Sequence, residues 1–385
     1  MSKQQKRYLD HNSTAPMSEA AIAAYVEAAR SLKGNASSLH WAGREARRRL
    51  EDARERIAAM LDAEPGSVVF TSGGTEADNI AVQGVLAQAD PGRVVSTAIE
   101  HPAVLRPLER WQTDAMRARG WRVDLVRPDG SGVVSARSMI ERIDRDTRLV
   151  CMMLANNETG AVQPVAEVAA HCRALGVPIL VDAVQGLGKV PLDIASLDAD
   201  FVALSAHKIG GPRGVGALLI RRGMRVPELA PGGGQERKRR SGTENVPGIV
   251  AFAAAMEGMD FTSTRALRDA FERELLRALP DARVFARTVE RVPNTSMFAL
   301  PGMDGETLLM QLDLAGFAVA SGSACSSGKR DPSHVLMAMG VEREIARGAI
   351  RVSFGPDNTR DDGRALVAAL VAARARLKRM AGLAA

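Results

Sequence analysis

The stretch Phe201-Val202-Ala203-Leu204-Ser205-Ala206-His207-Lys208 joins an apolar run to a lysine. Consecutive apolar residues of this kind predict a buried strand, and burying an ammonium group is costly unless it is paired or neutralised. Lysine has a flexible stem and a pKa that shifts readily, so Lys208 is a candidate for a covalent Schiff-base bond to an aldehyde. Taken alone, the position favours an ordinary surface lysine beside a strand, since most lysines are exposed.

A second apolar run ends in a carboxylate. Ile179-Leu180-Val181 is followed by Asp182 and then by Gln185. Pyridoxal phosphate needs an acid partner for its ring nitrogen and a lysine for its aldehyde. Asp182 and Lys208 match these needs, so the two strand ends together predict a pyridoxal phosphate site.

A third apolar run leads into a glycine-rich turn. Val68-Val69-Phe70-Thr71 precedes Ser72-Gly73-Gly74-Thr75, where small residues turn a strand into a helix. The free N–H groups at a helix start favour an anion. The cofactor phosphate is therefore expected at this turn, with a plain cap at the start of the helix as the alternative.

Short apolar segments alternate with helical ones from the glycine turn to about residue 220. The expected strands are Val68–Phe70, Arg93–Ser96, Arg122–Val126, Leu149–Leu154, Ile179–Val181, Phe201–Leu204 and Ala217–Ile220. The expected helices include Thr75–Ala89, Ala103–Arg119 and Val165–Leu175. This alternation predicts an α/β fold with a mostly parallel sheet covered on both faces, which binds ligands beyond the carboxyl ends of its strands.

The pattern changes after about residue 250. Helices are expected at Gly248–Met259 and Arg265–Leu279, and short strands at Asn294–Ala299, Ala318–Ser321 and Ala349–Phe354. We therefore expect a large cofactor-binding domain at residues 16–250 and a smaller α+β domain made of residues 1–15 and 251–385.

Composition narrows the class of protein. The chain of 385 residues has no apolar run long enough to cross a membrane and no signal peptide at its start, so a cytoplasmic location is expected. Its three cysteines lack the paired spacing of a disulfide framework or a zinc motif.

The net charge of +6 raises the question of nucleic-acid binding, mainly through two basic segments, Arg44–Arg49 and Glu236–Arg240. The first is expected to be a solvated helix face, because acidic residues follow it and only 4% of the chain is aromatic. The second is expected to be a loop. No direct nucleic-acid partner is predicted.

The ordered motifs of the chain resemble those of cysteine desulfurases of the nitrogenase-type and housekeeping iron–sulfur branch, within the class V aminotransferase family. The matching segments are Tyr8–Pro16, Asn35–His40, Thr71–Glu76, Glu100–His101, Asn156–Gly160, Gln235–Arg237, Arg240–Asn245, Ser321–Gly328, Pro332–Leu336 and Arg351–Gly355. The chain departs from the family pattern at His11 and at Ala36, and its Ser327–Asp331 segment, with Lys329 and Arg330, is unusually basic.

The resemblance implies the type I fold of pyridoxal-phosphate-dependent transferases and a role for each matching residue. Lys208 would bind the cofactor and then shuttle protons. Asp182 would bind the ring nitrogen of the cofactor and Gln185 its phenolic oxygen. His101 would stack on the face of the ring. The expected phosphate ligands are Gly74, Thr75, Ser205, His207 and, from a neighbouring subunit, Thr243.

The substrate carboxylate is assigned to Asn156, which also counts among the cofactor-binding residues, and to Arg351, whose planar guanidinium suits a carboxylate. In isolation, each of these residues also has an ordinary structural interpretation. His101 would be an ordinary loop or cap histidine, Asn156 a turn residue and Arg351 a surface residue on a strand.

Cys325 lies in a stretch of glycine, serine and alanine that predicts a mobile loop, as a sulfur carrier needs. The resemblance implies that L-cysteine becomes L-alanine while Cys325 becomes a persulfide. Cys325 is also a candidate transient ligand of an iron–sulfur cluster, and no other metal site is expected. Cys151 and Cys172 are expected to be structural, since cysteine often behaves as a small buried hydrophobe.

The expected partners are L-cysteine, a second copy of the chain in a homodimer, and a sulfur-acceptor protein such as an iron–sulfur scaffold. A selenocysteine lyase, another class V aminotransferase and a noncatalytic scaffold or basic binding module are the alternatives. Cys325 argues against a plain aminotransferase, which needs no thiol. The acceptor and any use of selenocysteine stay open.

Overall fold

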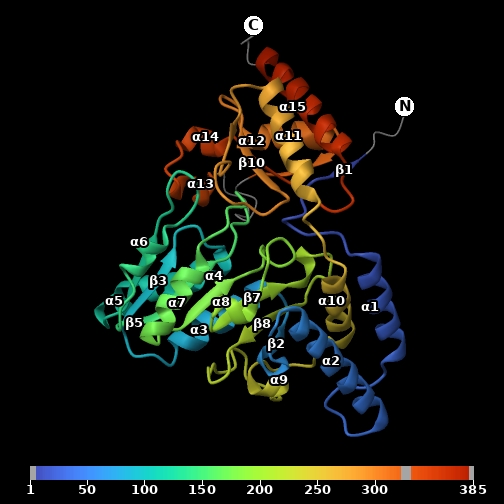
Figure 1. Cartoon of the computed structure of the whole chain (residues 1–385), viewed down its shortest axis with the longest axis vertical. Helices are drawn as coiled ribbons and strands as arrows, with labels where there is room; N and C mark the ends of the chain where they lie inside the picture. The colour runs from blue at the N-terminus through green and yellow to red at the C-terminus, as the bar shows by residue number, and fades with distance from the viewer. Residues whose placement is uncertain (1–5, 322–330, 381–385) are drawn as a thin grey trace.

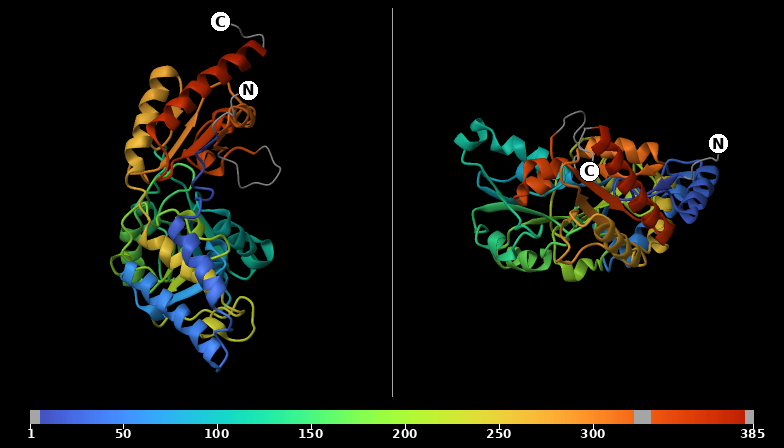
Figure 2. Two further views of the ribbon diagram at one scale, coloured as in Figure 1. Left: turned by 90° about the vertical axis from the view of Figure 1, so that its right-hand side faces the viewer. Right: turned by 90° about the horizontal axis from the view of Figure 1, so that it is seen from above.

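The computed structural model describes residues 6–321 and 331–380. A sheet-containing body lies at one end of the molecule, and a smaller body, coloured orange to red, lies at the other (Figure 1, Figure 2).

The larger body is built on a seven-stranded sheet in the order β2-β8-β7-β6-β5-β3-β4. Its strands are β2 Val68–Thr71, β3 Arg93–Thr97, β4 Arg122–Val126, β5 Thr147–Met153, β6 Ile179–Asp182, β7 Phe201–Ser205 and β8 Gly216–Ile220. β8 runs antiparallel to both β2 and β7, and the other neighbours are parallel. Every strand predicted before residue 250 is present, and the mostly parallel α/β fold is confirmed.

Helices cover both faces of this sheet. They are α1 Glu19–Ser31, α2 Trp41–Met60, α3 Gly74–Leu86, α4 Pro102–Glu109, α5 Asp114–Ala118, α6 Ala136–Ile140, α7 Val165–Leu175, α8 Ile194–Leu197, α9 Gln235–Lys238 and α10 Val246–Glu257. Short 3-10 turns occur at Pro65–Ser67, Arg110–Gln112 and Ala206–Lys208. Residues of α3 and α4 pack on one face of the sheet, and residues of α2, α7 and α10 pack on the other.

The alternation of side chains explains this layering. Successive strand residues point to opposite faces, so Leu180 and Ala203 join the core under α3 while Val181 and Val202 join the core under α10. Both faces are apolar, which is why these strands are continuous hydrophobic runs.

The predicted helix Ala103–Arg119 is wrong as a single element. α4 ends at Glu109, a 3-10 turn follows, and Thr113 has the extended angles φ −64° and ψ 152° before α5 begins. Trp111 in that turn packs against Trp121, with ring centroids 4.5 Å apart. The buried indole contact requires a break that the helical spacing does not reveal.

The smaller body has a four-stranded antiparallel sheet in the order β12-β13-β10-β9. Its strands are β9 Arg283–Val284, β10 Thr295–Ala299, β12 Ala320–Ser321 and β13 Ala349–Ser353, and a separate parallel pair joins β1 Arg7–Tyr8 to β11 Phe317–Ala318. Its helices are α11 Thr264–Ala278, α12 Gly305–Leu314, α13 His334–Ala338, α14 Arg343–Arg347 and α15 Arg360–Met380. The single expected strand Ala318–Ser321 is thus divided between β11 and β12.

The N-terminal strand β1 lies with the smaller body through its pairing with β11 (Figure 1). The expected bound at residue 250 falls inside α10, which packs against α1 and α2. The division into residues 16–250 and residues 1–15 plus 251–385 stays a prediction. Within the described part of the chain, no helix is long and apolar enough to cross a membrane.

Candidate active site

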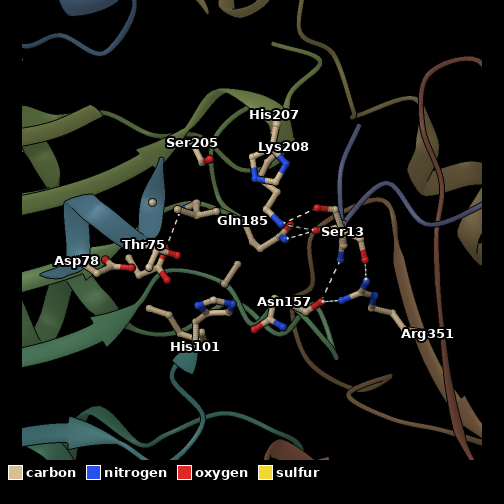
Figure 3. Close-up of a pocket in the computed structure, with 16 residues that line it drawn as sticks. Ser13, Thr75, Asp78, His101, Asn157, Gln185, Ser205, His207, Lys208 and Arg351 are labelled. Carbon is tan, nitrogen blue, oxygen red and sulfur yellow. Dashed lines mark hydrogen bonds between the residues drawn. The ribbon is translucent and has the colours of Figure 1, made fainter. Parts of the chain in front are cut away.

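A cavity of about 340 Å³ lies beyond the carboxyl ends of the central parallel strands, and Figure 3 shows the side chains that line it. The lining residues are Asn12, Ser13, Gly74, Thr75, Asp78, His101, Met153, Ala155, Asn157, Asp182, Val184, Gln185, Ser205, His207, Lys208 and Arg351. Most residues predicted for the cofactor site therefore meet in one place, as expected for the strand ends of an open α/β sheet.

Lys208 ends the 3-10 turn that follows β7 and points across the cavity (Figure 3). Its Nζ donates hydrogen bonds of 2.8 Å to the carbonyl oxygen of Asn12 and 2.9 Å to that of Ser13. The side chain is half-buried. The lysine is thus held over the cavity by main-chain oxygens, not directed into solvent.

Asp182 is the last residue of β6, the strand next to β7. One carboxylate oxygen, Oδ1, accepts a 2.9 Å hydrogen bond from the N–H of Val184. Burial raises the pKa of Asp182 to about 6, against the lowering effects of that hydrogen bond and of Lys208. The site therefore offers a buried acid that is stabilised in its charged form by any cation or N–H group placed beside it.

Two further buried carboxyl groups lie near Asp182. Asp78 of α3 lines the cavity, and burial, followed by the charges of Asp182 and Glu100, raises its pKa well above the usual range. Glu100 is completely buried, and burial raises its pKa to about 8. The sequence reasoning missed both, although Asp78 falls one turn after Gly74 on the apolar face of α3.

The start of α3 forms one wall of the cavity. Gly73 has φ +152°, and a Cβ added at Gly74 would lie 2.6 Å from Cγ2 of Val184. Facing this turn, the buried Oγ of Ser205 has no hydrogen-bond partner among the described residues. Free helix N–H groups and an unpaired hydroxyl make a fitting cradle for a phosphate.

His207, also predicted for the phosphate, lies between β7 and Lys208, and its Nδ1 is 3.2 Å from Oγ1 of Thr14. Burial, then the nearby charges of Lys208 and Arg213, lower its pKa to about 4. At neutral pH the imidazole is therefore uncharged, and it can bind an anion as a hydrogen-bond donor.

His101 lines the cavity and also caps α4. Its Nδ1 accepts a 3.1 Å hydrogen bond from the N–H of Ala103. Burial, then the charges of Lys208 and His334, lower its pKa to about 4. The neutral ring consequently carries its proton on Nε2.

Arg351 of β13 reaches the cavity from the smaller body (Figure 3). Its Nη2 donates to Oδ1 of Asp10 at 2.8 Å and to Oγ of Ser13 at 2.7 Å, while its Nη1 donates to the carbonyl oxygen of Asn157 at 3.0 Å. Its buried Nε has no partner within the described ranges. The guanidinium is therefore fixed in position and keeps an N–H unused.

The structure differs from the prediction at Asn156. This side chain is fully buried and its Oδ1 accepts hydrogen bonds from the N–H groups of Glu158 and Thr159, so its amide closes a turn instead of lining the cavity. The neighbouring Asn157 lines the cavity, with a buried Oδ1 that has no partner among the residues described. Asn157 is therefore a further candidate ligand, and the assignment of Asn156 stays a prediction.

Thr243, predicted for the phosphate, does not line this cavity. Thr243 is exposed, between α9 and α10, and the expected contact with a neighbouring subunit stays a prediction. Cys325, with Lys329 and Arg330, lies outside the described residues. Cys151 and Cys172 are both buried, and burial raises the pKa of each thiol, that of Cys172 to about 12.

The structure also shows where the basic segments lie, and where His11 and Ala36, which depart from the family pattern, lie. Arg47 and Arg48 form ion pairs with acidic residues along α2, as expected for a solvated helix face. The segment Glu236–Arg240 overlaps the four-residue element α9, but Glu236, Arg237 and Lys238 have the positive φ angles 44°, 58° and 61°, which are not those of an α-helix, so the expected irregular loop is compatible with the structure. Burial lowers the pKa of His11 to about 4, and Ala36 is buried just before α2.

The groups around the cavity fit pyridoxal phosphate. The α3 turn and Ser205 suit an anion, the buried Asp182 suits a ring nitrogen, and Lys208 suits an aldehyde. The three groups line the same cavity.

Comparison with known proteins identifies the family. The model of the aminotransferase class-V family matches residues 7–366. A cysteine desulfurase of Gluconacetobacter diazotrophicus is 42% identical over 92% of this chain and 90% of that protein. An IscS-like cysteine desulfurase of Mycobacterium tuberculosis is 41% identical over 97% of this chain and 98% of that protein.

Solved structures agree. A NifS-like protein has a TM-score of 0.87 at 34% identity, covering 96% of this chain and 99% of that one. DndA from Streptomyces lividans has a TM-score of 0.73 at 36% identity, covering 90% of this chain and 99% of that one. The chain therefore belongs to the aminotransferase class-V family.

Proposed function

We propose that this protein is a cysteine desulfurase that depends on pyridoxal phosphate. It converts L-cysteine to L-alanine and transfers the sulfur atom to the thiol of Cys325, which becomes a persulfide. The C–S bond of the substrate is broken and an S–S bond forms, and the thiol proton of Cys325 balances the hydrogen gained by alanine. No external oxidant or reductant is needed for this step.

One observation carries the proposal. Asp182 ends β6, Lys208 follows the adjacent parallel strand β7, and both line the same cavity as the start of α3 and Arg351. The acid would bind the ring nitrogen of the cofactor, the amine its aldehyde and the start of α3 its phosphate. The guanidinium would bind the carboxylate of an amino acid.

When bound, pyridoxal phosphate supplies an aldehyde that bonds to amines and a ring that withdraws electrons from the attached carbon. Lys208 would hold the aldehyde, Asp182 the ring nitrogen and Gln185 the phenolic oxygen. The start of α3, with Gly74, Thr75, Ser205 and His207, would hold the phosphate. His101 would lie against the ring face, as the family resemblance implies.

The substrate carboxylate would bind Arg351, whose fixed guanidinium lies opposite Lys208 in the cavity (Figure 3). Asn157 would add a second contact through its amide. Because the arginine is already held by Ser13 and Asp10, little side-chain freedom is lost when the substrate binds.

Proton movement would fall to Lys208, whose Nζ would be free to carry a proton once it no longer holds the aldehyde. The neutral imidazole of His101, with its proton on Nε2, would act as a hydrogen-bond donor at neutral pH.

Burial of the other two thiols supports Cys325 as the sulfur acceptor. A thiolate is the reactive form of cysteine, and the raised pKa values of Cys151 and Cys172 keep both groups protonated. Cys325, in its small-residue segment, is the remaining cysteine of the chain.

The finer expectations form part of the proposal. We infer a homodimer in which the exposed Thr243 contacts the cofactor phosphate of the partner, a protein acceptor such as an iron–sulfur scaffold, and a cytoplasmic location. Within one chain, the Nε of Arg240, near Thr243, donates a 2.8 Å hydrogen bond to Glu76 in the first turn of α3.

The test is a turnover assay of purified protein reconstituted with pyridoxal phosphate. L-cysteine should yield alanine, and sulfide should appear when a reductant is added. A protein that binds the cofactor but produces no alanine from L-cysteine contradicts the proposal, and alanine from L-selenocysteine alone would identify a selenocysteine lyase instead.

A further inference from the structure

A second lysine lies behind the cavity and is absent from the mechanism above. Lys189 follows β6 and Gln185, and only 4% of its surface is exposed. Burying an ammonium group in a protein interior is costly, so its position calls for a physical reason.

The contacts of Lys189 are unusual for a buried lysine. Its Nζ donates hydrogen bonds of 2.5 Å to Oε1 of Gln185 and 2.9 Å to Oδ1 of Asn12, and it lies 5.5 Å from the ring centroid of Phe261. Across the described ranges, no carboxylate lies within ion-pair distance of Nζ. A lysine that serves as a structural ion pair would have such a partner.

These contacts determine which end of the Gln185 amide faces which neighbour. A lysine Nζ bonded in this way donates, so it takes the carbonyl oxygen of Gln185. The main-chain oxygen of Asn12 can only accept, and it receives a 2.9 Å hydrogen bond from Nε2 of Gln185. Gln185 lines the cavity, and with Oε1 bonded to Lys189 and one N–H bonded to Asn12, its Nε2 keeps a second N–H as a donor.

Asn12 is fixed by the same lysine. Its Oδ1 also accepts a 3.0 Å hydrogen bond from Asn294, and its Nδ2 donates at 2.8 Å to Thr295. Its carbonyl oxygen receives hydrogen bonds from both Gln185 and Lys208. Lys189 therefore supports the segment that holds the reactive lysine as well as the glutamine.

We propose that Lys189 is a positioning residue that keeps the amide N–H of Gln185 directed at the cavity, and so stabilises a negatively charged oxygen on the cofactor. This inference rests on the proposed function, because it concerns the ring oxygen of pyridoxal phosphate. Lys189 acts through Gln185 and does not touch the cofactor.

The charges around Lys189 affect its own pKa and that of a neighbouring histidine. Burial, then the positive charges of Lys208 and Arg351, lower the pKa of Lys189 well below its ordinary value. His11 also faces it, and the charge of Lys189 contributes to the lowered pKa of that imidazole. A neutral amine still donates hydrogen bonds, so the orientation of Gln185 is kept in either protonation state.

The experiment is a spectrophotometric pH titration of the cofactor-loaded enzyme. The pH midpoint of the change in the visible absorption band should rise by about one unit in Lys189→Met, because losing a donor to an oxyanion favours its protonated form. Lys33→Met, at an exposed position, should keep the wild-type midpoint and is the matched control.

A second arm tests the route of the effect. In a Gln185→Leu background there is no amide to orient, so adding Lys189→Met should shift the midpoint much less than it does in the wild type. Equal shifts in the two backgrounds would overturn the proposed route. If Lys189→Met does not fold, Lys189→Leu replaces it with the same expectation, because leucine also lacks a hydrogen-bond donor.

The outcomes separate the two proposals. A wild-type protein that takes up no pyridoxal phosphate overturns the proposed function and this inference with it. A loaded enzyme whose midpoint is the same in the wild type and in Lys189→Met overturns the role of Lys189 and leaves the proposed function standing.

Discussion

The hydroxyl of Thr97 donates a 2.6 Å hydrogen bond to Oε1 of Glu100. The N–H of Met153 donates a second hydrogen bond, of 2.8 Å, to the same oxygen, whereas Oε2 is buried without a partner in the described part of the chain. Burial outweighs these two hydrogen bonds and raises the pKa of Glu100 to about 8. The folded protein therefore holds this carboxyl group in its neutral form at pH 7.

Glu100→Gln should change how stability depends on pH. Below about pH 4.5 the carboxyl is neutral in both states, but above it the unfolded chain releases the proton while the folded protein keeps it up to about pH 8. Ionisation of the unfolded chain thus lowers the free energy of unfolding of the wild type by up to roughly 5 kcal/mol, and the glutamine variant does not suffer this loss. Denaturant titrations at several pH values measure this difference.

The difference between Glu100→Gln and wild type should grow between these two pH values and level off above the higher one. Glu64→Gln, at an exposed position, is the control and should run parallel to the wild type. A constant difference for Glu100→Gln across the range would show that Glu100 is ionised in the folded protein.

Lys208→Ala should abolish the covalent link to the cofactor and reduce turnover by at least roughly a hundredfold, because both the linkage and a proton carrier are lost. Borohydride reduction of the wild-type holoenzyme, followed by peptide mass spectrometry, should find the cofactor attached to Lys208. Attachment to Lys189 or another lysine would refute this assignment, and Lys33→Ala should behave like the wild type.

Gly74→Ala should weaken cofactor binding and destabilise the protein by about 1–3 kcal/mol, because the new methyl group collides with Val184 at the phosphate turn. The double variant with Val184→Ala makes room for that methyl group and should recover most of the loss. Thermal unfolding and cofactor titration measure both effects. Simple additivity of the two substitutions would mean that the close approach does not limit binding.

Arg351→Lys should raise KM for L-cysteine by about 10-fold to 100-fold, with a smaller change in kcat. Lysine keeps the charge but loses the planar pair of donors that matches a carboxylate. Steady-state kinetics on fully loaded enzyme separate the two constants. Arg360→Lys, on the exposed start of α15, is the control, and an unchanged KM in Arg351→Lys would remove Arg351 from substrate binding.

Much of the large body could be predicted because its central strands are buried on both sides and form uninterrupted apolar runs. The same runs place Asp182 and Lys208 at strand ends, where their side chains reach the ligand site. Which of Asn156 and Asn157 lines the cavity was not predictable in this way, since it depends on which side chain forms hydrogen bonds within the following turn. Asp78, Glu100 and Lys189 were missed because their burial depends on packing between distant segments.

The central claim is that sulfur leaves L-cysteine and is carried by Cys325. Brief exposure of the loaded enzyme to L-cysteine, followed by mass spectrometry of its tryptic peptides, should find one added sulfur on the peptide that contains Cys325, together with alanine. Cys325→Ser should still bind cofactor and L-cysteine but should gain no sulfur, because a serine hydroxyl is a poor nucleophile at neutral pH. Added sulfur on Cys151 or Cys172, or alanine production by Cys325→Ser at the wild-type rate, would contradict the account.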